Sequence, residues 1–209
     1  MADATSILHV SPVIPVVTID DPQHAVPIAR ALADGGVRII ELTLRTESAL
    51  TSLKRIADEV PDILVGAGTV LTPAQADAAI HAGAQFLVSP GITKTLLDHL
   101  LTTGVPFLPG VATIGEVMGV LERGLTAMKF FPAGPAGGPG YLAAVGAPIP
   151  QVQFCPTGGI SLDSAPGYLA LPNVSCVGGS WLTPKTAVEN NDWEQITKLA
   201  REASGLSLD

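Results

Sequence analysis

The chain has 209 residues, of which 47% are hydrophobic and only 14% charged, and its formal net charge is −8. So many apolar residues exclude a disordered chain, and the negative charge without a basic cluster argues against binding to nucleic acids or anionic membranes. The two cysteines, Cys155 and Cys176, lie in apolar stretches without metal-ligand spacing, so we expect reduced core residues. The N-terminus lacks a signal-peptide pattern and no apolar run is long enough to cross a bilayer, which predicts a cytoplasmic protein.

Short apolar runs recur along the chain and predict eight strands, at residues 13–19, 37–44, 63–69, 85–90, 105–110, 127–133, 151–159 and 174–180. Continuous apolar runs are typical of parallel strands that are covered on both faces. Helical patterns separate them, at residues 21–36, 46–60, 72–84, 93–104, 113–124, the later part of 134–146, and 191–204. Thr, Ser or Asp stands at the start of several of these segments, as helix N-caps require.

Eight βα units in a chain of this length fit the (β/α)₈ (TIM) barrel. An open doubly wound sheet is the alternative, but no strand resembles an edge strand and no dinucleotide-binding fingerprint follows the first strand. We therefore expect residues 1–209 to form one α/β domain, a (β/α)₈ barrel with a short N-terminal extension and a C-terminal helix.

In such barrels the chemistry lies at the carboxyl ends of the strands. The polar residues near those predicted ends are Glu41, Arg45, Thr69, Ser89, Lys129, Thr157, Ser161 and Ser180. Among the other residues, the four histidines lack metal-ligand spacing, and we expect no metal and no cofactor.

Lys129 stands in the otherwise apolar stretch "AMKFFPAG", where a charged residue is rare. One interpretation is an ion-paired lysine at the boundary between the barrel and its helices. The other is a Schiff-base lysine, because desolvation disfavours the charged ammonium and a free amine can attack a ketone. The resulting iminium is an electron sink that allows an adjacent C–C bond to break.

Glu41 and Arg45 occur together in "IIELTLRT", the carboxylate within a strand and the guanidinium just beyond its end. They form either a structural salt bridge or two parts of a site. In the second case Glu41 moves protons as a general acid–base, and Arg45 holds a substrate carboxylate with its planar fork.

Two glycine pairs, each followed by a serine, end the last two predicted strands in "CPTGGIS" and "CVGGSWL". They either form tight turns that need glycine or let backbone N–H groups approach an anion. Because the pattern recurs on consecutive strands, and barrels often bind phosphate there, phosphate is the preferred ligand. Thr69 and Pro90, in "VGAGTV" and "SPG", are weaker candidates that turn geometry also explains.

Seven segments occur in one order across nearly the whole chain: "GVRIIELTLRT", "VGAGTVLTPAQ", "VSPGIT", "FLPGVAT", "MKFFPA", "FCPTGGIS" and "GGSWL". In this combination the chain resembles the 2-dehydro-3-deoxy-6-phosphogluconate (KDPG) aldolases, which also cleave 4-hydroxy-2-oxoglutarate (KHG). The resemblance implies a metal-independent class I lyase of the Entner–Doudoroff pathway that releases pyruvate and glyceraldehyde 3-phosphate. It also implies a homotrimer.

The resemblance assigns a role to each matching position. Lys129 corresponds to the Schiff-base residue and Glu41 to the acid–base. Arg45 and Thr69 would contact the pyruvate carboxylate, and Pro90 and Phe131 would line the pyruvoyl pocket. The residues around the phosphate would be Gly158, Gly159, Ser161, Gly178, Gly179 and Ser180.

The chain departs from some relatives at Gly134, where they have an acidic residue, and at Gln153, where they have a basic one. The 6-phosphogalactonate aldolases remain an alternative, since they differ only in the stereochemistry of the substrate. An isomerase or synthase that binds phosphate without covalent catalysis, and a non-catalytic sugar-phosphate-binding barrel, are further alternatives. The conjunction of Glu41 with Lys129 argues against simple binding.

Overall fold

The computed structural model describes residues 4–206. Its strands are β1 (Val13–Val17), β2 (Ile39–Thr43), β3 (Leu64–Gly68), β4 (Phe86–Val88), β5 (Phe107–Leu108), β6 (Gly110–Val111), β7 (Ala127–Phe130), β8 (Gln153–Pro156) and β9 (Val177–Gly179). Its helices are α1 (Thr5–Leu8), the 3₁₀ turn η1 (Pro22–His24), α2 (Ala25–Asp34), α3 (Ala49–Glu59), α4 (Pro73–His81), α5 (Lys94–Leu100), α6 (Ile114–Leu121), α7 (Gly138–Gly146), α8 (Ala165–Leu169), α9 (Lys185–Glu189) and α10 (Trp193–Ser204).

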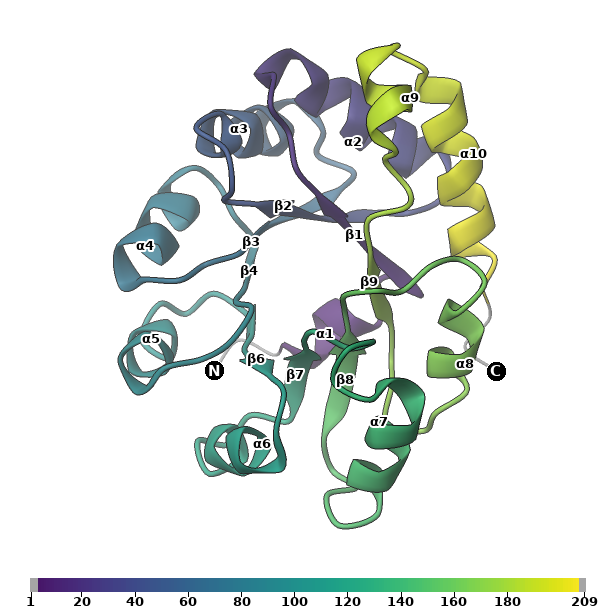
Figure 1. The fold of residues 1–209 in the computed structure, drawn as a ribbon. Coiled ribbons are helices and arrows are strands. Elements are labelled where there is room, and N and C mark those ends of the chain that lie inside the picture. Colours follow the sequence, from purple (N-terminus) through teal and green to yellow (C-terminus); the bar gives the residue numbers. More distant parts are fainter. Residues whose placement is uncertain (1–3, 207–209) are drawn as a thin grey trace.

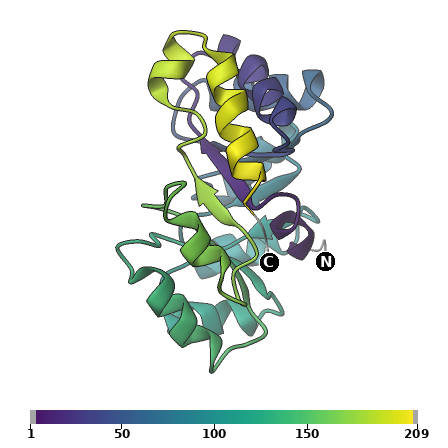
Figure 2. The ribbon, with the colours of Figure 1, turned by 90° about the vertical axis from the view of Figure 1, so that its right-hand side faces the viewer.

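The strands of the described chain pair in parallel within two sheets. One sheet has the order β5-β4-β3-β2-β1-β9 and the other the order β6-β7-β8, and a parallel bridge joins Thr157 to Gly178. Viewed along the strands, the sheets surround a common centre and the larger helices lie outside them (Figure 1). Figure 2 shows the same arrangement from the side. The predicted parallel α/β fold is confirmed.

The strand predicted at residues 105–110 is interrupted. Phe107–Leu108 pairs with β4, whereas Gly110–Val111 pairs with β7, and Pro109 separates the two. Proline has no N–H to donate to a ladder, which explains the break at that position. The strand predicted at 127–133 likewise ends at Phe130, before Pro132.

Helix starts agree with the capping pattern of the sequence. Thr72, Thr93 and Thr113 each accept a hydrogen bond from the backbone N–H three residues later, and Asp192 does the same for α10. Glu116 completes a capping box with Thr113. Local chemistry therefore determines where these helices begin.

The core consists of strand side chains and the inward faces of the helices, with Phe86, Phe130 and Phe154 among the largest fully buried residues. Gly66 is needed in this packing, because a Cβ there would lie 2.5 Å from Cδ1 of Phe86. None of the helices in the described part of the chain is long and apolar enough to cross a membrane.

Candidate active site

Lys129 points into the interior, where it meets Glu41. Its Nζ lies 2.9 Å from Oε1 and 3.3 Å from Oε2 of Glu41, and the two side chains are only 6% and 4% exposed. The residues come from β7 and β2, which are not sheet neighbours, so the ion pair spans the space that the strands enclose. The partner of Lys129 is thus a strand residue on the far side and not a residue of a surrounding helix.

The surroundings of this ion pair are close-packed. A Cβ at Gly68 would lie 2.6 Å from Cγ of Glu41, so only glycine leaves room for that side chain. The ring centroid of Phe131 lies 5.7 Å from the Nζ of Lys129, within reach of a cation–π interaction.

Two buried thiols complete these surroundings. The pKa of the Cys176 thiol is raised well above its ordinary value. The largest cause is the hydrogen bond with the Cys155 thiol, the second is burial, and the negative charge of Glu41 adds to the effect. The two cysteines are free, buried thiols, as predicted.

Arg45 and Thr69 lie together just beyond the ends of β2 and β3. The Nε of Arg45 donates to Oγ1 of Thr69 at 3.3 Å. Thr69 has a φ of 59°, a left-handed conformation that costs a β-branched residue about 1–2 kcal/mol. Such local strain is characteristic of functional sites.

A cavity of about 300 Å³ lies at the carboxyl ends of the strands. Seven predicted site residues line it: Arg45, Phe131, Gly158, Gly159, Gly178, Gly179 and Ser180. The strand-end candidate Thr157 lines it as well. Lys129 and Glu41 lie outside this lining, and Phe131 connects them with it.

The two glycine pairs differ in what they require. Gly158 and Gly159 have φ values of 101° and 76°, which only glycine adopts readily, so the tight-turn interpretation holds there. Gly178 is instead required by packing, since a Cβ would lie 2.9 Å from Cγ2 of Thr157. Gly179 likewise packs against the ring of Trp181. Both pairs border the cavity; Gly158 and Gly159 are partly or fully exposed there, whereas Gly178 and Gly179 are buried.

Three further predicted site residues, Thr69, Pro90 and Ser161, do not line this cavity either. Ser161 is exposed, and its N–H donates to Oγ of Ser164 at 2.9 Å in the turn before α8. Pro90 follows β4, where its backbone packs against Gly110. Their contacts with substrate remain predictions.

Sequence reasoning missed Val16, Thr18 and Ile160, which also line the cavity. For Thr18 a signal was present, because it is a polar residue near the end of the first predicted strand. Its Oγ1 lies 2.8 Å from Oγ1 of Thr43. Val16 and Ile160 are ordinary apolar residues, and nothing in the sequence distinguishes them.

Gln153 lies far from the cavity along its strand. It begins β8, whereas the cavity lies past the other end, and its side chain contacts Pro172 and Ser175 through hydrogen bonds of 3.3 and 2.9 Å. Its neutral side chain therefore says nothing about charge near the predicted phosphate position. Gly134, the other departure, donates its N–H to the carbonyl of Gly158.

A comparison with protein families finds that residues 4–199 match the model described as "Aldolase: KDPG and KHG aldolase". The chain belongs to this family. The resemblance that the sequence motifs predicted is thereby confirmed, as is the enzyme class.

Individual relatives agree with this assignment. The KHG/KDPG aldolase of Escherichia coli (strain K12) is 51% identical over 200 residues, which cover 96% of this chain and 94% of the relative. A crystal structure of KDPG aldolase from Legionella pneumophila, with pyruvate captured as a covalent carbinolamine, has a TM-score of 0.95 at 45% identity, covering 97% of this chain and 98% of that one. The Zymomonas mobilis ZM4 aldolase with 3-phosphoglycerate has a TM-score of 0.94 at 46% identity, covering 99% and 97%.

Proposed function

We propose that this KDPG/KHG-family aldolase cleaves 2-dehydro-3-deoxy-6-phosphogluconate to pyruvate and glyceraldehyde 3-phosphate through a Schiff base on Lys129. It also cleaves 4-hydroxy-2-oxoglutarate to pyruvate and glyoxylate. The observation that carries the proposal is the buried contact of 2.9 Å between Lys129 and Glu41, beside a cavity lined by Arg45 and the glycine pairs. The covalent pyruvate adduct of the Legionella relative supports the same chemistry.

The first half of the reaction forms the imine. Lys129 gives up a proton to Glu41, and the free amine attacks the C2 ketone of the sugar acid. Glu41 returns the proton to the carbinolamine oxygen and then carries a second proton from the nitrogen to the same oxygen, which leaves as water and gives the iminium. Arg45 and Thr69 hold the C1 carboxylate, so the ketone stays beside the amine.

The second half breaks the carbon–carbon bond. Glu41, through water, removes the proton of the C4 hydroxyl, the C3–C4 electron pair moves into the iminium, and the aldehyde departs. The remaining enamine is protonated at C3 and hydrolysed, which releases pyruvate and restores the amine. Pro90 and Phe131 line the pyruvoyl position in this proposal. The phosphate contacts Gly158, Gly159, Ser161, Gly178, Gly179 and Ser180.

We infer that residues 1–209 form one (β/α)₈ barrel, with β5 and β6 as two parts of a single interrupted strand. The β1–β9 pairing and the bridge from Thr157 to Gly178 support closure.

We also propose a cytoplasmic homotrimer. Three exposed apolar side chains are available for an interface: Leu71, Ile114 and Met118 are 54%, 42% and 51% exposed. Light scattering would then give a molar mass three times the 21.4 kDa of the chain.

Two measurements test the reaction. A lactate-dehydrogenase-coupled assay should show pyruvate release from phosphorylated gluconate substrate, faster than from its galactonate counterpart, and also from KHG. Borohydride with pyruvate should add mass irreversibly at Lys129, and the Lys129→Met variant should not gain it. Faster turnover of the galactonate substrate would favour the 6-phosphogalactonate alternative. Failure to trap pyruvate would favour an enzyme without a covalent step.

A further inference from the structure

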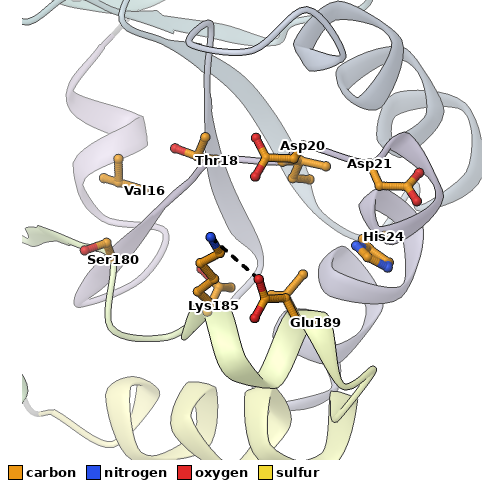
Figure 3. Close-up of a pocket in the computed structure, with 11 residues that line it drawn as sticks. Val16, Thr18, Asp20, Asp21, His24, Ser180, Lys185 and Glu189 are labelled. Carbon is orange, nitrogen blue, oxygen red and sulfur yellow. Dashed lines mark ion pairs between the residues drawn. The ribbon is translucent and has the colours of Figure 1, made fainter.

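A second cavity, of about 480 Å³, lies next to the first. It is enclosed by the segment from β1 to η1 on one side and by the segment from β9 to α9 on the other (Figure 3). Val16, Thr18 and Ser180 line both cavities, so the two adjoin, and together they are called the depression. Ser180 stands at the boundary, beside the proposed phosphate position.

Fixed positive charge is scarce in this depression. Among the described residues that line the two cavities, the basic ones are Arg45 and Lys185. Arg45 is hydrogen-bonded to Thr69, and in the proposed function it binds the carboxylate end of the substrate. Lys185 is the remaining cation, and it follows Ser180 by five residues on the wall of the second cavity.

The other charged groups of the second cavity are acidic. Asp20, Asp21 and Glu189 line it together with His24. Asp21 accepts a hydrogen bond from the N–H of Gln23, which fixes it as the cap of η1.

Lys185 is free to respond to a ligand in this surrounding. Its Nζ lies 3.6 Å from Oε1 of Glu189, and the two side chains are 81% and 59% exposed. So long and exposed an ion pair holds its partners weakly. In Figure 3 the Lys185 side chain points from α9 into the space between Ser180 and Asp20.

We propose that Lys185 is a specificity-determining residue that favours phosphorylated substrates, and that Asp20 opposes it across the cavity. This inference rests on the proposed function. KDPG carries a phosphate dianion at the end away from its carboxylate, and Lys185 is the cation on the wall next to the proposed phosphate position. Because it is exposed, it attracts the dianion through water, which affects substrate capture and leaves the chemical step unchanged.

The test compares KDPG with KHG, which is shorter and lacks the phosphate. For Lys185→Gln we expect KM for KDPG to rise about three- to tenfold at low ionic strength. The effect is modest because water weakens the attraction between an exposed lysine and the phosphate. The kcat should stay within twofold, and kcat/KM should fall less for KHG, whose far anion is a singly charged carboxylate closer to the reacting carbons. Asp20→Asn should lower KM for KDPG, and added salt should reduce both effects.

Lys54→Gln is the matched control, because Lys54 also forms an exposed i,i+4 ion pair, with Asp58 at 3.0 Å on α3. It should leave both substrates unaffected. The inference is overturned if Lys185→Gln leaves KM for KDPG unchanged, or raises it equally for KHG. A wild-type chain that does not cleave KDPG overturns the proposed function, and the inference with it.

Discussion

Gly68→Ala provides a sharp test of the position of Glu41. The added Cβ would lie 2.6 Å from Cγ and 2.7 Å from Cδ of Glu41, whereas carbon atoms pack at about 3.5–4.0 Å. The carboxylate therefore has to retreat by roughly 1 Å. Because it is hydrogen-bonded to the Nζ of Lys129 at 2.9 Å, this movement breaks the contact on which the proposed proton transfer depends.

Two magnitudes follow from that displacement. Overpacking a well-filled interior costs about 1–3 kcal/mol of stability, which leaves most domains folded. A misplacement of about 1 Å in a catalytic group lowers the rate about a hundredfold. We therefore expect Gly68→Ala to remain folded and to lose far more activity than stability.

The assay measures kcat for pyruvate release at 25 °C together with the thermal unfolding midpoint. Gly167→Ala on α8 is the control, because a Cβ there meets nothing within 4 Å and should change neither quantity much. Borohydride trapping of pyruvate on Lys129 should slow in parallel with kcat. If Gly68→Ala turned over within twofold of wild type, the close placement of Glu41 would not limit the reaction, and the acid–base argument would fail.

Further predictions concern single groups. Glu41→Gln should lower kcat about 10²- to 10⁴-fold in the coupled assay, as loss of a general acid–base requires, and an unchanged kcat would contradict its role. Hydrogen bonds from the backbone N–H of Ala112 and then of Thr113 lower the pKa of Glu116, so its stabilisation is present above the ordinary pKa of an unfolded glutamate and is lost as pH falls through the lower folded pKa. Urea unfolding should show Glu116→Ala about 0.5 kcal/mol less stable than wild type at pH 7, with the gap closing under acid conditions. The buried Cys155 and Cys176 should react with a thiol reagent only in denaturant, and rapid labelling of the native protein would disprove that packing. A chelator should leave kcat unchanged.

Local patterns in the sequence were sufficient for most elements but not for all. Strands could be predicted from apolar runs, and helices from hydrophobic periodicity and N-cap residues, because both patterns depend only on residues close together in the sequence. Helices α8 and α9 were not predicted, since each has only five residues and little periodicity can be detected over such a length. The interruption at Pro109 had a visible cause in the sequence, but which part pairs with which neighbour depends on the assembled sheets.

The direction of Lys129 shows why site geometry was harder to predict than site composition. In an amphipathic strand, alternation indicates which side chains face the core. Strand β7 is buried on both faces, with Ala127, Met128 and Phe130 all buried, so its pattern contains no such signal. Only the assembled fold places the amine next to Glu41.

The ion pair between Lys129 and Glu41 was open to two interpretations, a structural salt bridge or a catalytic acid–base pair, and the geometry makes them compatible. An unpaired ammonium in this interior would be costly, so the resting enzyme needs the Glu41 carboxylate as a counter-ion. The same carboxylate, at 2.9 Å, is the group that can take the proton when a ketone arrives, because the transfer crosses one existing hydrogen bond. In the proposed mechanism, a structural salt bridge and an acid–base pair are then the same contact at two stages of one reaction. On this argument, replacing both residues with well-packed apolar side chains would abolish turnover without unfolding the chain, whereas removing Glu41 alone would affect both.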